Sequence, residues 1–169
     1  MIERQTSKYL NLTFIIIVVS FLGSTIHFGK YNTDVVHFGD SGGYYVYLPS
    51  LFIHNDFGFI EEIMGDGSGD YSGKFDGPVV NKYTCGVAVL QSPFFGIGHI
   101  AAGITGAKQD GYSYPYLLAI MIGVIFYVMW GLYLLSRVLL KLFEEKVVVV
   151  IIVALALATN LFYFTFIYN

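Results

Sequence analysis

The chain contains few charged residues. Only 12% of its 169 residues are Asp, Glu, Lys or Arg, whereas a soluble domain carries about a quarter. The 12 acidic residues outnumber the 9 basic ones, and no cluster of lysine and arginine alternates with aromatic residues. The sequence therefore lacks the signature of a nucleic-acid-binding protein. Because 56% of the residues are hydrophobic, the composition instead indicates a chain embedded in a lipid bilayer.

Cysteine and histidine are also scarce. The single cysteine, Cys85, cannot form an internal disulfide, so it gives no information on the redox compartment and is interpreted as a small packing residue. The four histidines stand at positions 27, 37, 54 and 99, and no two of them are three or four residues apart. Two ligands on one helix face need that spacing, so the sequence predicts no zinc site within this chain.

The stretch GDGSGDYSGKFDGP, residues 65–78, is rich in glycine and aspartate. Asp66, Ser68 and Asp70 have the spacing of the first ligands in a calcium-binding loop. However, Tyr71 stands at the sixth position, where a glycine is required, and Gly77 stands at the twelfth, where a glutamate is required. We therefore interpret the stretch as a solvated turn.

Three apolar runs are long enough to cross a bilayer as helices, which takes about 20 residues. They are residues 10–27, 115–135 and 147–168, and we predict that each is a transmembrane helix. A fourth run, TCGVAVLQSPFFGIGHIAAGIT at 84–105, has the length but contains several polar residues and a proline. Whether this fourth run crosses the membrane decides the topology.

The basic residues favour one of the two topologies. If 84–105 does not cross, the basic residues next to the three predicted spans fall on one side of the membrane; they are Arg4, Lys8, Arg137, Lys141 and Lys146. Positive charge gathers on the cytoplasmic side of membrane proteins, so this arrangement is favoured. Residues 137–146 then form a cytoplasmic turn, and residues 28–112 form one extracytoplasmic loop.

Within residues 28–112, hydrophobic and aromatic residues recur in blocks at 44–53, 57–64 and 83–105. In the first block, Tyr44 and Leu48 fall on one face at helical spacing, and a proline at 49 predicts a kink or restart. Each block is typical of an amphipathic helix that lies on the membrane surface. The expected fold is therefore an all-α integral membrane protein with three transmembrane helices and interfacial helices in a large first extracytoplasmic loop.

Asp40 opens the first block in the sequence GDSGGYY. One interpretation is a helix N-cap, because an aspartate side chain can accept hydrogen bonds from free backbone N–H groups. The other is a general base, because the glycines at 42 and 43 allow a ligand to approach closely and the tyrosines that follow supply rigid walls. Both interpretations stay open from the sequence.

Lys82 and the pair Thr159–Asn160 are two further polar features in apolar surroundings. Lys82 opens the last block and either extends its ammonium to lipid headgroups or holds the phosphate of a lipid carrier. Thr159 and Asn160 interrupt the last apolar run, which indicates a contact between transmembrane helices.

Taken in order, these segments resemble the N-terminal part of a GT-C membrane glycosyltransferase. The resemblance is carried by one anchor span, the acid-led stretch GDSGGYYVYLPSLF, the lysine-led stretch NKYTCGVAVLQSPFF, a span that runs GLYLLSRVLLKLFEEK into a basic turn, and a last span that ends TNLFYFTF. It covers nearly the whole chain, as order and spacing more than identity. The most similar families are the dolichyl-phosphate-mannose–protein mannosyltransferases and the bacterial lipid A aminoarabinose transferases.

The resemblance implies a multi-pass protein of the bacterial inner membrane. It would transfer a sugar from a polyprenyl-phosphate donor to a lipid, glycan or protein acceptor on the extracytoplasmic face, in contact with membrane lipid. By the same resemblance, Asp40 is the catalytic acid of the first loop, Lys82 and Tyr83 bind the donor phosphate, and Tyr44 and Tyr45 line the substrate pocket.

This sequence departs from the family pattern in two places. Ser41 follows the acid where many members carry a second acid, and Tyr83 follows the lysine where many have proline. The use of a divalent metal therefore stays open, and the sequence indicates no other cofactor.

The family usually has many more transmembrane helices than this chain. We therefore expect residues 1–169 to be one membrane domain and an N-terminal piece of a longer transferase. The alternative is a non-enzymatic three-span scaffold, which explains the composition but gives no reason for the sequence around Asp40.

Overall fold

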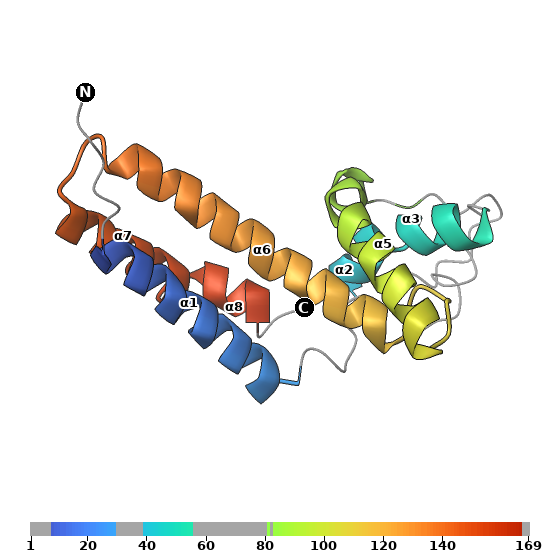
Figure 1. Cartoon of the computed structure of the whole chain (residues 1–169). Coiled ribbons are helices and arrows are strands. Elements are labelled where there is room, and N and C mark those ends of the chain that lie inside the picture. Colours follow the sequence, from blue (N-terminus) through green and yellow to red (C-terminus); the bar gives the residue numbers. More distant parts are fainter. Residues whose placement is uncertain (1–7, 30–38, 56–80, 82, 167–169) are drawn as a thin grey trace, which may run out of the picture. The chain divides into compact units, whose positions relative to one another are not determined.

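The computed structural model of the chain describes residues 8–29, 39–55, 81 and 83–166 (Figure 1). Within these ranges 81% of the residues are helical and no strand is formed, which confirms the all-α class. Two compact units are present. The bundle unit consists of residues 1–29 and 124–168, and the site unit consists of residues 30–123 with residue 169.

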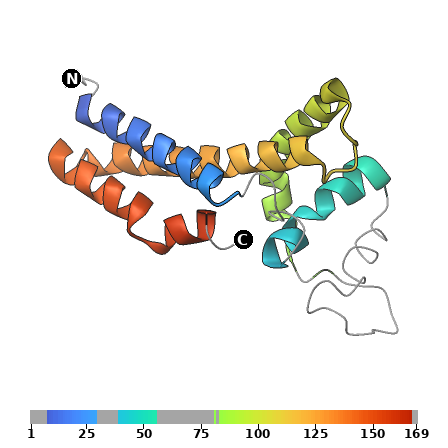
Figure 2. The same cartoon turned by 90° about the horizontal axis from the view of Figure 1, so that it is seen from below.

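The bundle unit contains α1 (Lys8–His27), α7 (Glu145–Leu157), α8 (Asn160–Phe166) and the second part of α6 (Tyr114–Leu139). Figures 1 and 2 show these helices side by side. Their facing positions recur at helical spacing, so each helix contributes one apolar stripe to the core. The buried core residues are Leu10, Ile17, Phe21, Ile125, Leu132, Val148, Ile152 and Ala156.

Two threonines of α1 are buried in the bundle unit without loss of hydrogen bonds. Thr13 donates its hydroxyl to the Tyr9 carbonyl at 2.8 Å, and Thr25 donates to the Phe21 carbonyl at 3.0 Å. Because these bonds lie within the helix, the hydroxyls need neither water nor a second helix.

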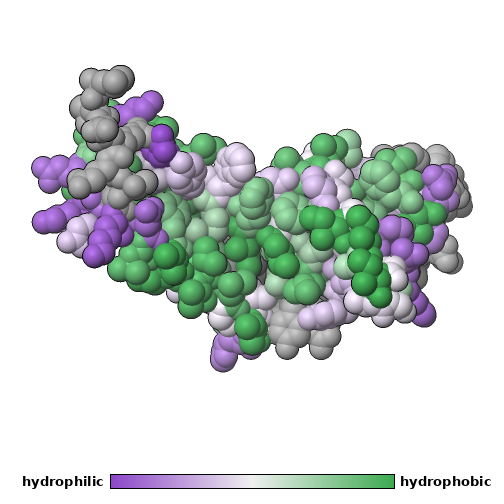
Figure 3. All heavy atoms as spheres, viewed as in Figure 1, coloured by the Kyte–Doolittle hydropathy of each residue, from purple (hydrophilic) through white to green (hydrophobic). Residues whose placement is uncertain are grey.

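The outer faces of the bundle unit are apolar as well. Figure 3 shows hydrophobic residues over the sides of these helices and hydrophilic residues at the end where α1 begins and α6 ends. On α1 and α6 the exposed large side chains include Ile15, Val19, Ile26, Phe126, Trp130 and Leu134. Large apolar side chains on the outside are stable in lipid and costly in water.

Three helices are long and apolar enough to cross a membrane: α1, α5 (Gly86–Thr105) and α6. The chain therefore has the helices of a multi-pass membrane protein. The first two predicted spans, 10–27 and 115–135, lie within α1 and α6. The third helix of membrane-crossing length is α5 and not the predicted run 147–168. α5 lies within the run 84–105, for which the sequence left open whether it crosses the membrane.

The run 147–168 is divided between α7 and α8. The Thr159 hydroxyl lies at the break, where it donates to the Leu155 carbonyl at 2.7 Å and accepts a hydrogen bond from the Leu161 N–H at 3.2 Å. Both helix ends thus gain a partner for a free backbone group. Thr159 and Asn160 are exposed, and the contact between helices expected there stays a prediction.

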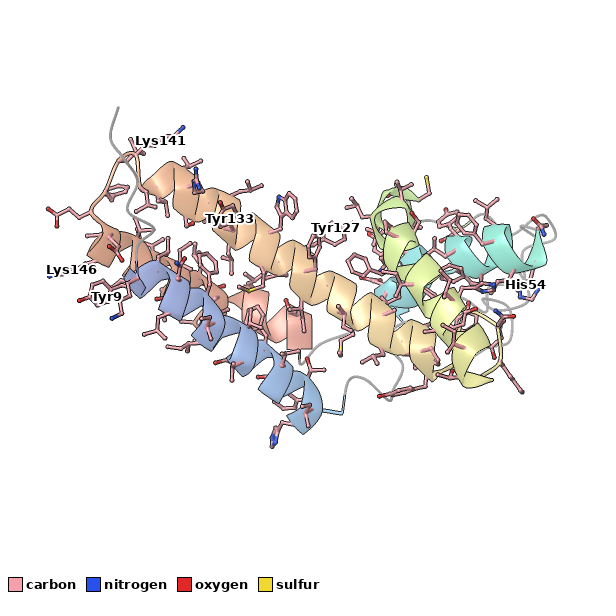
Figure 4. All side chains as sticks on the ribbon, viewed as in Figure 1. Tyr9, His54, Tyr127, Tyr133, Lys141 and Lys146 are labelled. Atoms are coloured by element: carbon pink, nitrogen blue, oxygen red, sulfur yellow. The ribbon has the colours of Figure 1, made fainter. Side chains whose placement is uncertain are left out.

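Basic residues gather at one end of the bundle unit. Lys8 begins α1, Arg137 lies in the last turn of α6, and the Arg137 Nη1 donates to the Tyr133 hydroxyl at 3.0 Å. Lys141 and Lys146 lie at the same end (Figure 4). This grouping is compatible with a cytoplasmic location of that end, which stays a prediction.

The site unit begins with α2 (Gly39–Tyr45), α3 (Tyr47–Pro49) and a π-helical turn, η1 (Ser50–His54). The helical path changes at Pro49 because proline has no N–H to donate to the preceding turn. The segment ends at Asn55, whose φ of 52° is left-handed. The first predicted helical block, 44–53, is therefore helical and interrupted as expected, whereas the block 57–64 lies outside the described residues.

The 20-residue helix α5 continues through a proline. Pro93 cannot donate to the Val89 carbonyl, and the Ser92 hydroxyl donates to it instead, at 2.8 Å. One face of α5 packs into the core of the site unit, formed by Tyr45, Leu48, Ala88, Phe95, Ala102, Tyr116, Leu117 and Ile120. The opposite face is also apolar, with Val89, Ile97, Ile100 and Ile104 exposed. An interfacial helix would have a polar face there, so the exposed face of α5 has the composition of a lipid-facing surface.

Candidate functional site

Asp40 lies in the first turn of α2 and is exposed. Its carboxylate oxygen Oδ1 accepts a hydrogen bond from the Tyr83 hydroxyl at 2.5 Å, across 43 residues of sequence. A carboxylate in a first helical turn is favoured by the helix dipole. Among the described residues, this is the only hydrogen bond of the Asp40 side chain, which therefore contacts Tyr83 rather than the backbone N–H groups that an N-cap would bind.

Tyr83 is held at four points. Its backbone N–H donates to the Asn81 Oδ1 at 3.0 Å, and its carbonyl accepts a hydrogen bond from the Tyr47 hydroxyl at 2.5 Å. Its ring lies against Gly43, where an added Cβ would overlap ring atom Cδ2. Its hydroxyl reaches Asp40. The position of this side chain is therefore set by backbone bonds, by ring packing and by the carboxylate together.

Asn81 joins the two segments of the site. Its Nδ2 donates to the Gly43 carbonyl at 2.7 Å, while its Oδ1 accepts the Tyr83 N–H. The second bond is a turn of the kind that asparagine forms with the residue two positions on. Asn81 thus fixes the backbone that carries Tyr83 to the backbone of α2.

Tyr44 supplies a second aromatic ring, which packs against Tyr83. Its ring packs edge-to-face on Tyr83, with centroids 4.8 Å apart and an interplanar angle of 62°. Tyr44 is half-buried, so part of the ring is accessible. The structure therefore places Tyr83, predicted to bind the donor phosphate, against Asp40, and it places Tyr44, predicted to line the pocket, against Tyr83.

Tyr45 lies elsewhere. Its side chain is fully buried in the core of the site unit, where the ring packs against Phe95 and Tyr112 and the hydroxyl donates to the Gly111 carbonyl. Burial raises the pKa of the Tyr45 hydroxyl, which therefore stays protonated. Tyr45 points away from the face that carries Tyr44, because consecutive helical residues lie about 100° apart, so it stabilises the core and does not line the pocket.

Lys82, predicted to hold the donor phosphate, lies outside the described residues. Its neighbours Asn81 and Tyr83 are both bound at the site.

The sequence interpretation missed Asn81 as a site residue. Tyr47 is one of the tyrosines expected to wall the site, and it shares one helix face with positions 40, 43 and 44; all four contact Tyr83. The signal for Asn81 was its position two residues before Tyr83, because an asparagine side chain can accept a hydrogen bond from the backbone N–H two residues on. Burial raises the pKa of the Tyr47 hydroxyl, which keeps it a hydrogen-bond donor to the Tyr83 carbonyl.

A second polar cluster joins α5 to the start of α6. His99 Nδ1 and the Tyr116 hydroxyl are 2.6 Å apart, and Gln109 Nε2 donates to the His99 carbonyl at 3.3 Å. The Asp110 Oδ1 accepts the N–H groups of Tyr112 and Ser113, both at 2.8 Å. These bonds connect one helix to the next, and we interpret the cluster as structural. In the part of the chain that the structure describes, no three His, Cys, Asp or Glu side chains group closely enough to hold a metal ion.

Comparisons of the chain with models of protein families, with curated proteins and with solved structures gave no match. Function therefore has to be inferred from the chemistry of the site. That chemistry consists of an exposed carboxylate with one oxygen bound by a tyrosine, a second aromatic ring packed on that tyrosine, and a position directly before an apolar helix of membrane-crossing length.

Proposed function

We propose that this chain is part of a GT-C type glycosyltransferase of the bacterial inner membrane. It transfers a sugar from a polyprenyl-phosphate donor to a lipid, glycan or protein acceptor on the extracytoplasmic face. The observation that carries the proposal is the 2.5 Å contact between Asp40 and Tyr83, two residues from separate segments that the resemblance assigns to one active site.

In the proposed reaction, an acceptor hydroxyl or amine attacks the anomeric carbon of the sugar. The new bond forms between that carbon and the acceptor, while the bond from the carbon to the phosphate oxygen breaks and the lipid phosphate leaves with the electron pair. Asp40 takes the proton of the acceptor. General-base assistance of this kind typically accelerates a reaction by about 10²- to 10⁴-fold. The exposure of Asp40 supports this role, because an acceptor can reach the carboxylate.

Negative charge grows on the leaving phosphate in the transition state, and a fixed ammonium stabilises it. We assign this role to Lys82, which stands between the two site residues Asn81 and Tyr83 in the sequence. The accessible part of the Tyr44 ring lies beside Asp40's partner Tyr83 and is assigned to the sugar.

The lipid-linked donor is supported by the position of the site in the chain. Tyr83 precedes α5 by three residues, and α5 is apolar on both faces and long enough to enter the bilayer. A site at the end of such a helix lies close to the membrane surface. There it can receive a phosphate headgroup while the polyprenyl chain remains in lipid.

The proposal is tested with the chain, and with any longer reading frame that contains it, purified in detergent and returned to lipid vesicles. Radiolabelled polyprenyl-phosphate sugars are supplied as donors, and transfer to lipid, glycan or protein is followed. We expect transfer that depends on Asp40. If no labelled donor binds and none is consumed by either form, the proposal is wrong and the non-enzymatic scaffold remains.

A further inference from the structure

One face of the α2–α3 segment is directed at a single residue. The Asp40 carboxylate, the Gly43 backbone, the Tyr44 ring and the Tyr47 hydroxyl each contact a different part of Tyr83. Four positions of one helix face thus contact Tyr83. Together they fix both its side chain and its backbone.

The hydroxyl of Tyr83 contacts a charged group, the Asp40 carboxylate. Its hydrogen bond to Oδ1 of Asp40 is of the charge-assisted type, which is short and about twice as strong as a neutral hydrogen bond. Without it, an exposed aspartate in a first helical turn would sample several rotamers. With it, one carboxylate oxygen is bound, and the other, Oδ2, accepts no hydrogen bond from any residue that the structure describes.

We infer that Tyr83 is a positioning residue for Asp40: it binds Oδ1 and thereby presents Oδ2 as the oxygen that takes the proton from the acceptor. This inference rests on the proposed function for the identity of the reaction, but the contact itself does not. It changes the role that the resemblance implies for Tyr83, which is binding of the donor phosphate.

The hydrogen-bonding capacity of tyrosine supports the change of role. A phenolic hydroxyl carries one proton and so donates one hydrogen bond at a time. An ionised phosphate accepts hydrogen bonds but has no proton with which to donate one. While the Tyr83 proton is donated to Asp40, it is therefore not available to the donor phosphate.

The test compares Tyr83→Phe with Tyr114→Phe, both of which remove one hydroxyl and keep the ring. Tyr114 is exposed and begins α6, outside the two segments that carry Asp40 and Tyr83, so its variant is the matched control. For Tyr83→Phe we expect kcat for sugar transfer to fall about tenfold or more, the loss expected for a hydrogen bond to a charged group, with the KM for the polyprenyl-phosphate sugar within about twofold of the parent. A raised KM with unchanged kcat would instead assign Tyr83 to the donor and overturn the inference.

A second measurement does not depend on activity. Thermal unfolding is followed for Asp40→Ala, Tyr83→Phe and the double variant. If the two side chains act through their mutual hydrogen bond, the double variant loses little more than the more damaging single variant. Strictly additive losses in Tm would show that the contact contributes nothing and would overturn the inference. Absence of transfer by the parent protein would refute the proposed function, and the unfolding cycle would still decide whether Tyr83 holds Asp40.

Discussion

The ring of Tyr83 lies against the backbone of Gly43, where any side chain on residue 43 would overlap it. Residue 43 has a helical backbone, which any amino acid other than proline can adopt, so backbone conformation does not explain why a glycine stands there. It is explained by the close approach of the tyrosine, whose hydroxyl can reach Asp40 only if the ring lies this near to the helix.

Gly43→Ala is therefore expected to displace Tyr83. An added methyl group normally favours a helix, but here it overpacks a contact, which costs about 1–3 kcal/mol. Gly96→Ala is the matched control, because the added Cβ meets no atom within 4 Å and should stabilise α5 by about 0.5–1 kcal/mol. Thermal unfolding in detergent checks the prediction. If Gly43→Ala is as stable as Gly96→Ala and transfers sugar normally, the packing of Tyr83 on Gly43 has no influence on the site.

Asp40→Asn tests the general base. Asparagine caps a helix about as well as aspartate and keeps the shape of the side chain, but it has no carboxylate to accept a proton. We expect near-normal folding and donor binding, with sugar transfer reduced by about a hundredfold or more. Asp66→Asn, in the glycine-rich stretch 65–78, should change little. Transfer within a few-fold of the parent would leave Asp40 a structural residue only.

Lys82→Met tests the donor-phosphate assignment, which is a prediction from the sequence. Methionine keeps an apolar stem but removes the ammonium, so binding of a polyprenyl phosphate should weaken while membrane insertion is retained. Lys108→Met, which removes an exposed lysine outside the site, is the control. Binding is measured with a fluorescent polyprenyl phosphate in vesicles. Equal affinity in both variants would mean that Lys82 only extends to lipid headgroups.

The topology prediction now depends on α5, which has the length and composition of a span. In a Cys85→Ser background, single cysteines at Ser72 and Lys108 should react with a membrane-impermeant maleimide from outside, and one at Glu144 should not. Native Cys85 is exposed and should react from outside in either topology, so it calibrates the assay. Protection at Lys108 together with reaction at Glu144 would show that α5 crosses the membrane and that Arg137, Lys141 and Lys146 lie outside.

Hydropathy was sufficient to locate α1 and α6, because a mainly apolar helix of 20 or 26 residues satisfies its own backbone hydrogen bonds and needs no partner to be recognised. It was not sufficient for the run 147–168. There the hydroxyl of Thr159 stabilises the ends of two shorter helices, and an average over many residues does not detect the effect of one side chain.

The sequence by itself determined the helical class, the two long apolar helices and Asp40 and Tyr44 as candidates, because length, apolar periodicity and residue chemistry are local properties. Tyr83 became a candidate only through the family resemblance. Only the tertiary structure decided which candidates meet. Tyr44 and Tyr45 are adjacent and chemically identical, yet one lies beside Tyr83 and the other is buried in the core, since consecutive residues of a helix point in different directions. The contact between Asp40 and Tyr83 spans 43 residues, and it forms because Asn81, Gly43 and Tyr47 bring two separate backbone segments together.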